Sequence, residues 1–166
     1  MIALNDFNRL EHDEAVACLR PCVAIESWSE ALADARPFAS LSALFDYGHG
    51  ISLAWDEAAL AQALSAHPRI GEKPAGQQTH AAMSRQEQSA VNDCDADLTQ
   101  SLREGNARYE ARFGRVFLIR AKGRSGEAIL QALEQRLKNS DAEEVQSALT
   151  QLREITLLRL EGVVGE

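Results

Sequence analysis

Three side chains that can carry acid–base or charge chemistry occupy unusual positions in this sequence: His67, Glu87 and Arg159. His67 precedes Pro68, which pushes the residue before it out of the helical conformation, so His67 is expected at a helix end. The intrinsic pKa of an imidazole permits proton transfer near neutral pH. Two interpretations are open: a structural histidine that closes a helix, or a catalytic one beside the long glycine-bearing loop 69–83.

Glu87 follows Ser84 at the spacing of a capping box, which predicts that a helix begins here. In the structural interpretation, Glu87 satisfies a free backbone amide and Gln88 is simply a good helix former. In the functional interpretation, the same helix start presents free amides, a carboxylate and a carboxamide to a ligand. A carboxylate beside His67 would raise the pKa of the imidazole and orient its ring.

Arg159 interrupts the apolar arc of the last predicted helix. At about 100° per residue it lies among the four apolar residues of that arc: Val145, Ala148, Leu152 and Ile155. Arg153 lies off the arc, towards the polar side. Arg159 either extends its charged head into water near the helix end, or faces the interior to hold a carboxylate or a polarised carbonyl by a bidentate contact.

Composition limits the classes of protein that fit. The 166 residues suit one domain, which we place at residues 1–166, and the formal charge of −8 disfavours nucleic acid or an anionic membrane as the main partner. No apolar run approaches the roughly 20 residues of a membrane span. Three scattered cysteines suit a reducing cytosol, and the four histidines lack metal-ligand spacing, so neither disulfides nor a metal site are predicted.

Helical signals cover nearly the whole chain, and they predict an all-α, single-domain bundle of about seven to nine helices. In the first half, we expect a capping box at Ser27–Glu30, a helix capped by Ser40, a break at Gly48-His49-Gly50, and a helix from Asp56-Glu57 to about Ala66. Only one short segment, 116–119, is ambiguous between an extended and a helical conformation.

In the second half, a long helix from Ser84 is expected to end at Gly114, and a turn is expected at 122–126. A further helix carries Ile129, Leu130, Leu133 and Leu137. Ser140–Glu143 is another capping box, which predicts a last helix to about Leu160.

Taken together, the motifs of this chain resemble one family. They are Arg36-Pro37-Phe38, His67-Pro68-Arg69-Ile70-Gly71-Glu72, Ser84 with Glu87-Gln88, Asn106 with Tyr109, Phe113-Gly114-Arg115-Val116-Phe117, Arg136-Leu137 with Asn139, and Leu158-Arg159-Leu160. In this order and spacing they are similar to the OHCU decarboxylases, where OHCU is 2-oxo-4-hydroxy-4-carboxy-5-ureidoimidazoline. The resemblance extends from Leu4-Asn5 to Leu160.

The resemblance implies an all-helical cytosolic enzyme, commonly a homodimer, that acts without metal or organic cofactor. Its reaction is the last step from urate to (S)-allantoin. Position by position, His67 matches the catalytic histidine, Glu87 its acidic partner and Arg159 the C-terminal arginine. The matching substrate contacts are Pro68, Ser84, Arg85, Gln86, Glu87, Gln88, Phe117, Ile119, Arg120, Ala121, Lys122 and Gly123.

Two other classes of protein stay open at this point. A non-catalytic helical adaptor would explain the capping boxes and the acidic charge. A metal-dependent hydrolase of the ureide pathway could use His67, Glu87 and other histidines. The adaptor does not explain an inward Arg159 together with His67-Pro68 at a loop, and full activity in a chelator would exclude the hydrolase.

Overall fold

The computed structural model describes residues 1–65, 67, 83, 86–87 and 96–166, and these residues are mostly helical. Eight α-helices lie among them, so the predicted all-α fold is confirmed. The elements are β1 (Ile2–Ala3), α1 (Leu4–Arg9), α2 (His12–Leu19), the 3-10 turn η1 (Arg20–Cys22), α3 (Glu26–Asp34), α4 (Leu41–Ser52), α5 (Glu57–Leu64), α8 (Ala96–Phe113), α9 (Gly126–Arg136), α10 (Asp141–Val163) and β2 (Val164–Gly165). None of the described helices is both long and apolar enough to cross a membrane.

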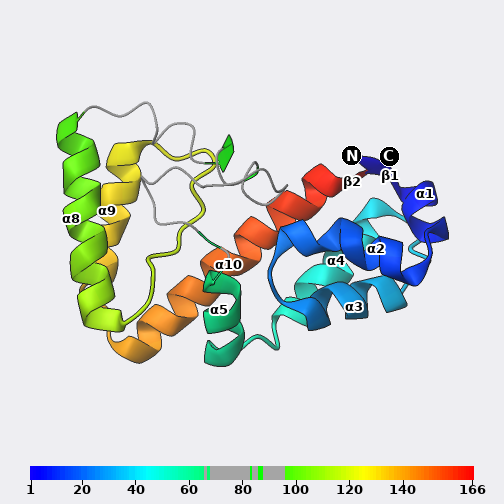
Figure 1. The fold of residues 1–166 in the computed structure, drawn as a ribbon, viewed down its shortest axis with the longest axis horizontal. Coiled ribbons are helices and arrows are strands. Elements are labelled where there is room, and N and C mark those ends of the chain that lie inside the picture. Colours follow the sequence, from blue (N-terminus) through cyan, green and yellow to red (C-terminus); the bar gives the residue numbers. More distant parts are fainter. Residues whose placement is uncertain (66, 68–82, 84–85, 88–95) are drawn as a thin grey trace. The chain divides into compact units, whose positions relative to one another are not determined.

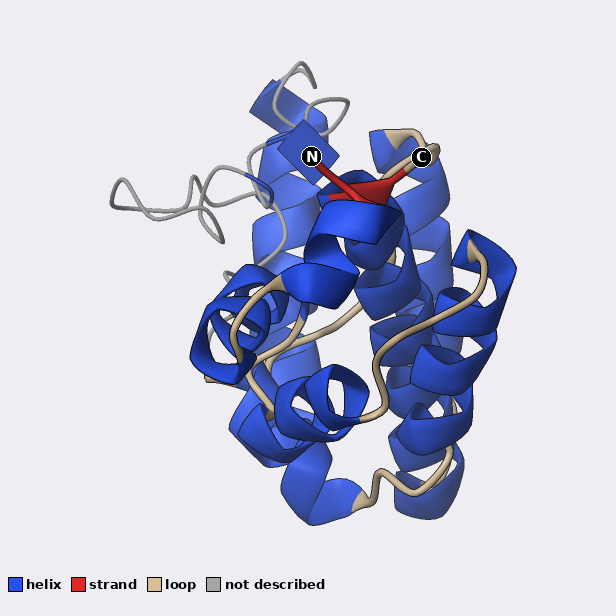
Figure 2. Ribbon diagram, turned by 90° about the vertical axis from the view of Figure 1, so that its right-hand side faces the viewer, coloured by secondary structure: helices blue, strands red, loops and turns tan. Residues whose placement is uncertain are grey.

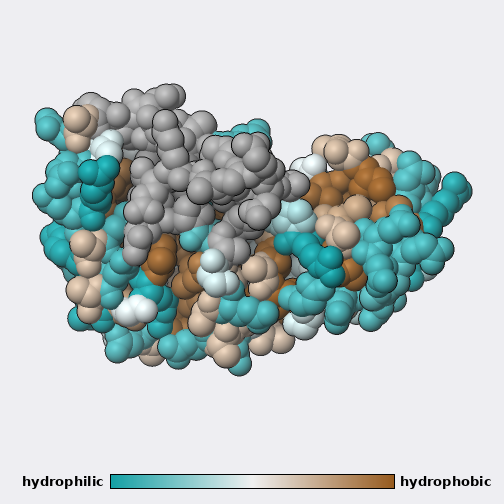
Figure 3. All heavy atoms as spheres, in the orientation of Figure 1, coloured by the Kyte–Doolittle hydropathy of each residue, from teal (hydrophilic) through white to brown (hydrophobic). Residues whose placement is uncertain are grey.

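The chain divides into two compact units. The terminal unit consists of Met1–Ala63 with Arg153–Glu166, and the central unit consists of Leu64–Leu152. The two boundaries between them fall within α5 and α10. On the face drawn in Figure 3, hydrophilic side chains cover most of the described surface, and the hydrophobic ones gather in small patches.

The terminal unit is built on helix contacts between neighbours in sequence. Helix α2 packs against α3, and α3 packs against α4 (Figure 1). β1 pairs in parallel with β2, so the two ends of the chain lie side by side (Figure 2). The sequence does not predict this strand pair, because two residues per strand are too few to show an alternating pattern.

The capping box predicted at Ser27–Glu30 is wrong. Helix α3 begins one residue earlier, at Glu26, and Ser27 is its second residue. The buried Ile25 precedes the helix in an extended conformation, and its carbonyl oxygen accepts a hydrogen bond from the backbone N–H of Trp28 at 3.1 Å. Burial of these two apolar side chains therefore sets the helix start.

The break predicted at Gly48-His49-Gly50 is also wrong, because α4 continues through all three residues to Ser52. Gly48 is buried, and a Cβ at this position would lie 3.4 Å from side-chain atoms of Trp28 and Leu160. The indole N–H of Trp28 donates to the carbonyl oxygen of Gly48 at 2.9 Å. The glycine thus serves close packing rather than a turn.

Other local signals are confirmed. The Ser40 hydroxyl accepts from the N–H of Ala43 at 3.1 Å at the start of α4. At the start of α10, the Glu143 N–H donates to the Ser140 hydroxyl at 3.2 Å, and the Ser140 N–H donates to the Glu143 carboxylate at 3.0 Å. Hydrogen bonding to the Glu143 carboxylate, from the Ser140 backbone N–H first and then from the Ser140 side chain, lowers the pKa of Glu143. Helix α10 then runs to Val163, three residues beyond the predicted end.

The central unit places α8 beside α9 (Figure 1). Gly114, at φ +73°, follows the last residue of α8, as the sequence predicts. The apolar segment 116–119 forms neither helix nor strand. It enters a core with residues of α8 and α9, whose buried members are Leu102, Tyr109, Phe117, Ile119, Ala121, Ile129 and Leu133.

Candidate active site

His67 lies just beyond α5, as the His67-Pro68 pair predicts. Its backbone N–H donates to the carbonyl oxygen of Leu64, the last residue of the helix, at 3.1 Å. The residue is half-buried, and its ring Nε2 is shielded from solvent. An imidazole with a shielded nitrogen at a helix end suits proton transfer to a bound ligand better than exchange with bulk water.

Glu87 is a half-buried helical residue, and Gln86 before it is exposed. Of the other predicted substrate contacts in this part of the chain, four lie outside the described residues: Pro68, Ser84, Arg85 and Gln88. The capping box at Ser84 therefore stays a prediction, as do most of the loop 69–83 and the contact between Glu87 and His67.

Arg159 faces the interior of the terminal unit, with only 4% of its surface exposed. Its Nη1 donates to the carbonyl oxygen of Pro21 at 3.2 Å. The interpretation in which its head extends into water is therefore wrong. Burial raises the pKa of the neighbouring Cys22 thiol to about 12, against the opposing effect of the Arg159 charge.

The three predicted catalytic residues are divided between the two units. His67 and Glu87 are in the central unit, and Arg159 is in the terminal unit. Each has the burial that a ligand-facing group needs. Their convergence on one substrate stays a prediction.

The predicted substrate segment 117–123 crosses the central unit. Phe117, Ile119 and Ala121 are buried, with 1%, 4% and 5% of their surfaces exposed. Arg120 is half-buried, whereas Lys122 and Gly123 form an exposed turn in which Gly123 has φ +81°. The segment therefore packs its apolar side chains into the core of the central unit and then turns at the surface.

Two side chains from α9 and α10 hold this segment by its backbone. The Arg136 Nη1 donates to the carbonyl oxygen of Leu118 at 2.5 Å. The N–H of Arg120 donates to Oε1 of Gln151 at 2.9 Å. Buried backbone groups require partners, and side chains can supply them to a segment that lies outside helices and strands.

Glu144 is a buried carboxylate that the sequence analysis does not single out. It is 0% exposed and accepts hydrogen bonds from the Tyr109 hydroxyl at 2.6 Å, from Nε of Arg136 at 2.9 Å and from Nδ2 of Asn139 at 3.1 Å. It also forms an ion pair with Nη2 of Arg136. Burial, followed by the bond to Glu144, raises the pKa of Tyr109 well above its usual value.

A signal for Glu144 was present in the sequence. The residue lies four positions before Ala148 and therefore on the same arc of α10 as Arg159. The test that singled out Arg159, a charged residue among apolar ones, applies equally to Glu144. Val145, which the sequence analysis placed on that arc, is only half-buried.

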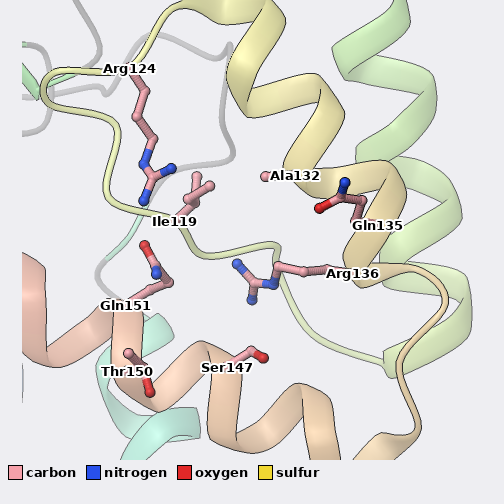
Figure 4. A pocket seen from close by; sticks show the side chains of 8 residues that line it. All are labelled: Ile119, Arg124, Ala132, Gln135, Arg136, Ser147, Thr150 and Gln151. Atoms are coloured by element: carbon pink, nitrogen blue, oxygen red, sulfur yellow. The ribbon is translucent and has the colours of Figure 1, made fainter.

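A pocket of about 260 Å³ lies between the substrate segment, α9 and α10. Figure 4 shows its lining side chains: Ile119, Arg124, Ala132, Gln135, Arg136, Ser147, Thr150 and Gln151. Two guanidinium groups, two carboxamides and two hydroxyls suit carboxylate or ureido oxygens. Of the predicted substrate contacts, Ile119 lines this pocket.

Within the part of the chain that the structure describes, no three His, Cys, Asp or Glu residues are arranged to hold a metal ion. Cys18 and Cys22 are free thiols, half-buried and buried. A second pocket, of about 350 Å³, lies in the terminal unit beside Trp28 and Trp55 and contains none of the predicted site residues.

Comparison with known proteins identifies the family. Residues 8–161 match the model of the OHCU decarboxylase family. The chain is 29% identical to the 2-oxo-4-hydroxy-4-carboxy-5-ureidoimidazoline decarboxylase of Haloferax volcanii, over 96% of this chain and 94% of that protein. It is 28% identical to the uric acid degradation bifunctional protein PucL of Bacillus subtilis, of which it spans 33%.

A solved structure agrees with this match. The crystal structure of an OHCU decarboxylase in the presence of (S)-allantoin superposes with a TM-score of 0.73 at 26% identity, over 87% of this chain and 94% of that one. The predicted family and a decarboxylase activity therefore agree with the sequence relatives and with the fold. The chain belongs to the OHCU decarboxylase family.

Proposed function

We propose that this protein decarboxylates 2-oxo-4-hydroxy-4-carboxy-5-ureidoimidazoline to (S)-allantoin and CO2, the last step of urate degradation to allantoin. The observation that carries the proposal is the family match over residues 8–161, which extends across both units. It supports one decarboxylase-like domain over residues 1–166. As the resemblance implies, the proposal includes a cytosolic homodimer that needs no metal or organic cofactor.

The reaction needs a group that accepts the electrons of the breaking C–C bond. This substrate contains its own acceptor, the conjugated C=N of the imidazoline ring. As CO2 leaves, the electron pair of the C–C bond enters the ring, and one proton then completes the product. The protein must therefore place the substrate, stabilise charge and deliver that proton to one face.

The predicted site residues divide these tasks. His67 delivers the proton, and Glu87 orients the imidazole. Arg159 and the backbone amides of 119–123, apart from that of Arg120, which donates to Gln151, hold ring or ureido oxygens and stabilise the charge that grows in the transition state. The buried side chains of Phe117 and Ile119 favour release of neutral CO2 because they remove water from the leaving carboxylate.

The test is an assay of freshly generated substrate that records CO2 release and, by circular dichroism, the formation of (S)-allantoin. The substrate decays spontaneously, so the rate must exceed that background. A chelator should leave the rate unchanged, which would exclude a metal-dependent hydrolase. No acceleration over the background would contradict the proposed function.

A pair of histidine variants tests the site. His67→Asn should lower turnover by about 10²–10⁴-fold, the usual contribution of general acid–base catalysis. His49→Asn is the matched control, because His49 is exposed on α4, and its turnover should equal that of the wild type. Near-normal turnover of a folded His67→Asn variant would remove His67 from proton transfer.

A further inference from the structure

The segment 117–121 is fixed from one side by groups that are distant in sequence. The two backbone anchors are two residues apart: the carbonyl of Leu118, held by Arg136, and the N–H of Arg120, held by Gln151. Figure 4 shows Arg136 extending from α9 and Gln151 from α10 towards this segment. Loss of either anchor would free a backbone group at the residues that flank Ile119.

Arg136 contacts the segment twice. Besides its bond to the Leu118 carbonyl, its guanidinium carbon lies 4.6 Å from the centroid of the Phe117 ring. Tyr109 packs against the same ring, with centroids 5.2 Å apart. Arg136 thus holds Phe117 through its side chain and Leu118 through its backbone carbonyl.

Glu144 fixes Arg136 in turn. This fully buried carboxylate accepts a hydrogen bond from Nε of Arg136 and pairs with its Nη2. The remaining nitrogen, Nη1, donates to the carbonyl oxygen of Leu118. A planar guanidinium bound along one edge has a fixed direction along the other. The carboxylate therefore determines where Arg136 points, and Arg136 determines where residue 118 lies.

We propose that Arg136 and Gln151 are positioning residues of the decarboxylase, and that Glu144 holds Arg136 in its active orientation. They act through the backbone of 117–121, and four residues of this segment are substrate contacts that the family resemblance implies: Phe117, Ile119, Arg120 and Ala121. The inference rests on the proposed function for the identity of the ligand. Because a displacement of about 1 Å can cost up to 10²-fold in rate, a loosened segment should be measurable in catalysis.

The first test compares Arg136→Lys with Tyr109→Phe. A lysine ammonium still pairs with Glu144 but lacks the planar fork that spans Glu144 and the Leu118 carbonyl, so kcat/KM should fall about tenfold. Tyr109→Phe removes one hydrogen bond from Glu144 and keeps the ring against Phe117. It should lower Tm and leave kcat/KM within about twofold of the wild type.

The second test is a rescue at Gln151. Gln151→Leu removes the acceptor of the Arg120 N–H and should lower kcat/KM by about tenfold. Gln151→Glu retains an acceptor oxygen at the same reach and should restore most of this loss. Comparing the two Gln151 variants distinguishes the loss of the backbone anchor from a general effect of any substitution at this half-buried position.

Amide hydrogen exchange provides a readout that does not depend on activity. Peptides covering 117–123 should exchange faster in Arg136→Lys and Gln151→Leu, and at the wild-type rate in Tyr109→Phe and Gln151→Glu. Wild-type exchange and kcat/KM in the first two variants, with only Tm lowered, would overturn the proposal. If the wild type itself lacks decarboxylase activity, the proposed function fails, and the exchange data alone still decide the positioning of the segment.

Discussion

Each unit uses an arginine to hold backbone carbonyl groups, near helix ends in the terminal unit and in a non-helical segment in the central unit, and the two arginines differ in their partners. In the terminal unit, Arg36 donates through Nη1 to the carbonyl oxygens of Phe7 and Leu10, at 2.8 and 2.7 Å, and through Nε to that of Ala33 at 2.8 Å. Its hydrogen bonds among the described residues all go to neutral acceptors. Its guanidinium also lies 5.5 Å from the centroid of the Phe7 ring.

In the central unit, Arg136 donates to one backbone carbonyl and to a carboxylate that is fully buried. Both arginines are half-buried, so the difference lies in Glu144. A buried carboxylate is costly without a cation, and a buried cation is costly without it. Arg36 therefore serves the packing of helix ends, whereas Arg136 belongs to a coupled ion pair that fixes the predicted substrate segment.

The largest expected effect is at Glu144. Glu144→Gln keeps the shape but leaves the Arg136 charge without its buried partner, so the free energy of unfolding should fall by about 3–5 kcal/mol. Urea denaturation measures this change. Glu134→Gln, at an exposed position on α9, is the control and should leave stability unchanged. Equal stability of the two variants would show that the charge of Glu144 does not stabilise the half-buried Arg136.

A smaller effect is expected at Arg36. Arg36→Met removes three hydrogen bonds but leaves only neutral carbonyls behind, so the free energy of unfolding should fall by about 1–3 kcal/mol. At a temperature well below its Tm, the variant should keep a wild-type kcat/KM, unlike Arg136→Lys. A tenfold loss of kcat/KM in folded Arg36→Met would show that both arginines affect the site.

The smallest effect is expected at the exposed pair of Arg20 and Glu26, whose closest atoms are 2.8 Å apart. The hydrogen bond from Arg20 lowers the pKa of Glu26 below 4.5. A lowered folded-state pKa stabilises the protein above the unfolded-state value, and this stabilisation is lost as pH falls through the folded-state value. Surface pairs contribute little, so any Tm difference between wild type and Glu26→Gln should be small at neutral pH.

The pH dependence of the Tm difference gives a stricter test of the pair of Arg20 and Glu26. The Tm difference between wild type and Glu26→Gln should shrink as pH falls from neutral, and it should vanish once the pH lies below the lowered folded-state pKa of Glu26. It should also shrink when salt is added at neutral pH, because solvent-exposed charges are screened. A difference that grows on acidification would contradict the sign of the pKa shift.

Signals within a few residues of each other were sufficient for several of the helix ends. Ser40, the Ser140–Glu143 pair and Gly114 act where the sequence places them, because a cap or a positive φ depends on the immediate neighbours. The 3.6-residue period placed Arg159 on the apolar arc of the last helix, and the structure then decided between the two interpretations by showing that the side chain is buried. The family followed from motifs spread over the chain, and the comparisons confirm it.

The sequence-based predictions that were wrong depend on contacts made in the tertiary structure. Gly48 looks like a break until Trp28 and Leu160 pack against it, and Ser27 looks like a cap until Ile25 and Trp28 are buried together. The catalytic roles of His67, Glu87 and Arg159 stay predictions, which the decarboxylase assay and its variants test.

By itself, the sequence determined the helical class, most of the helix ends and the family, since each depends on local spacing or on motif order. Only the tertiary structure decided that Glu144, Arg136 and Tyr109 form one buried cluster and that Arg136 and Gln151 hold the segment 117–121. These residues lie 8 to 35 positions apart. No local pattern brings them together, because their contacts exist only when three helices and a non-helical segment pack around the same charge.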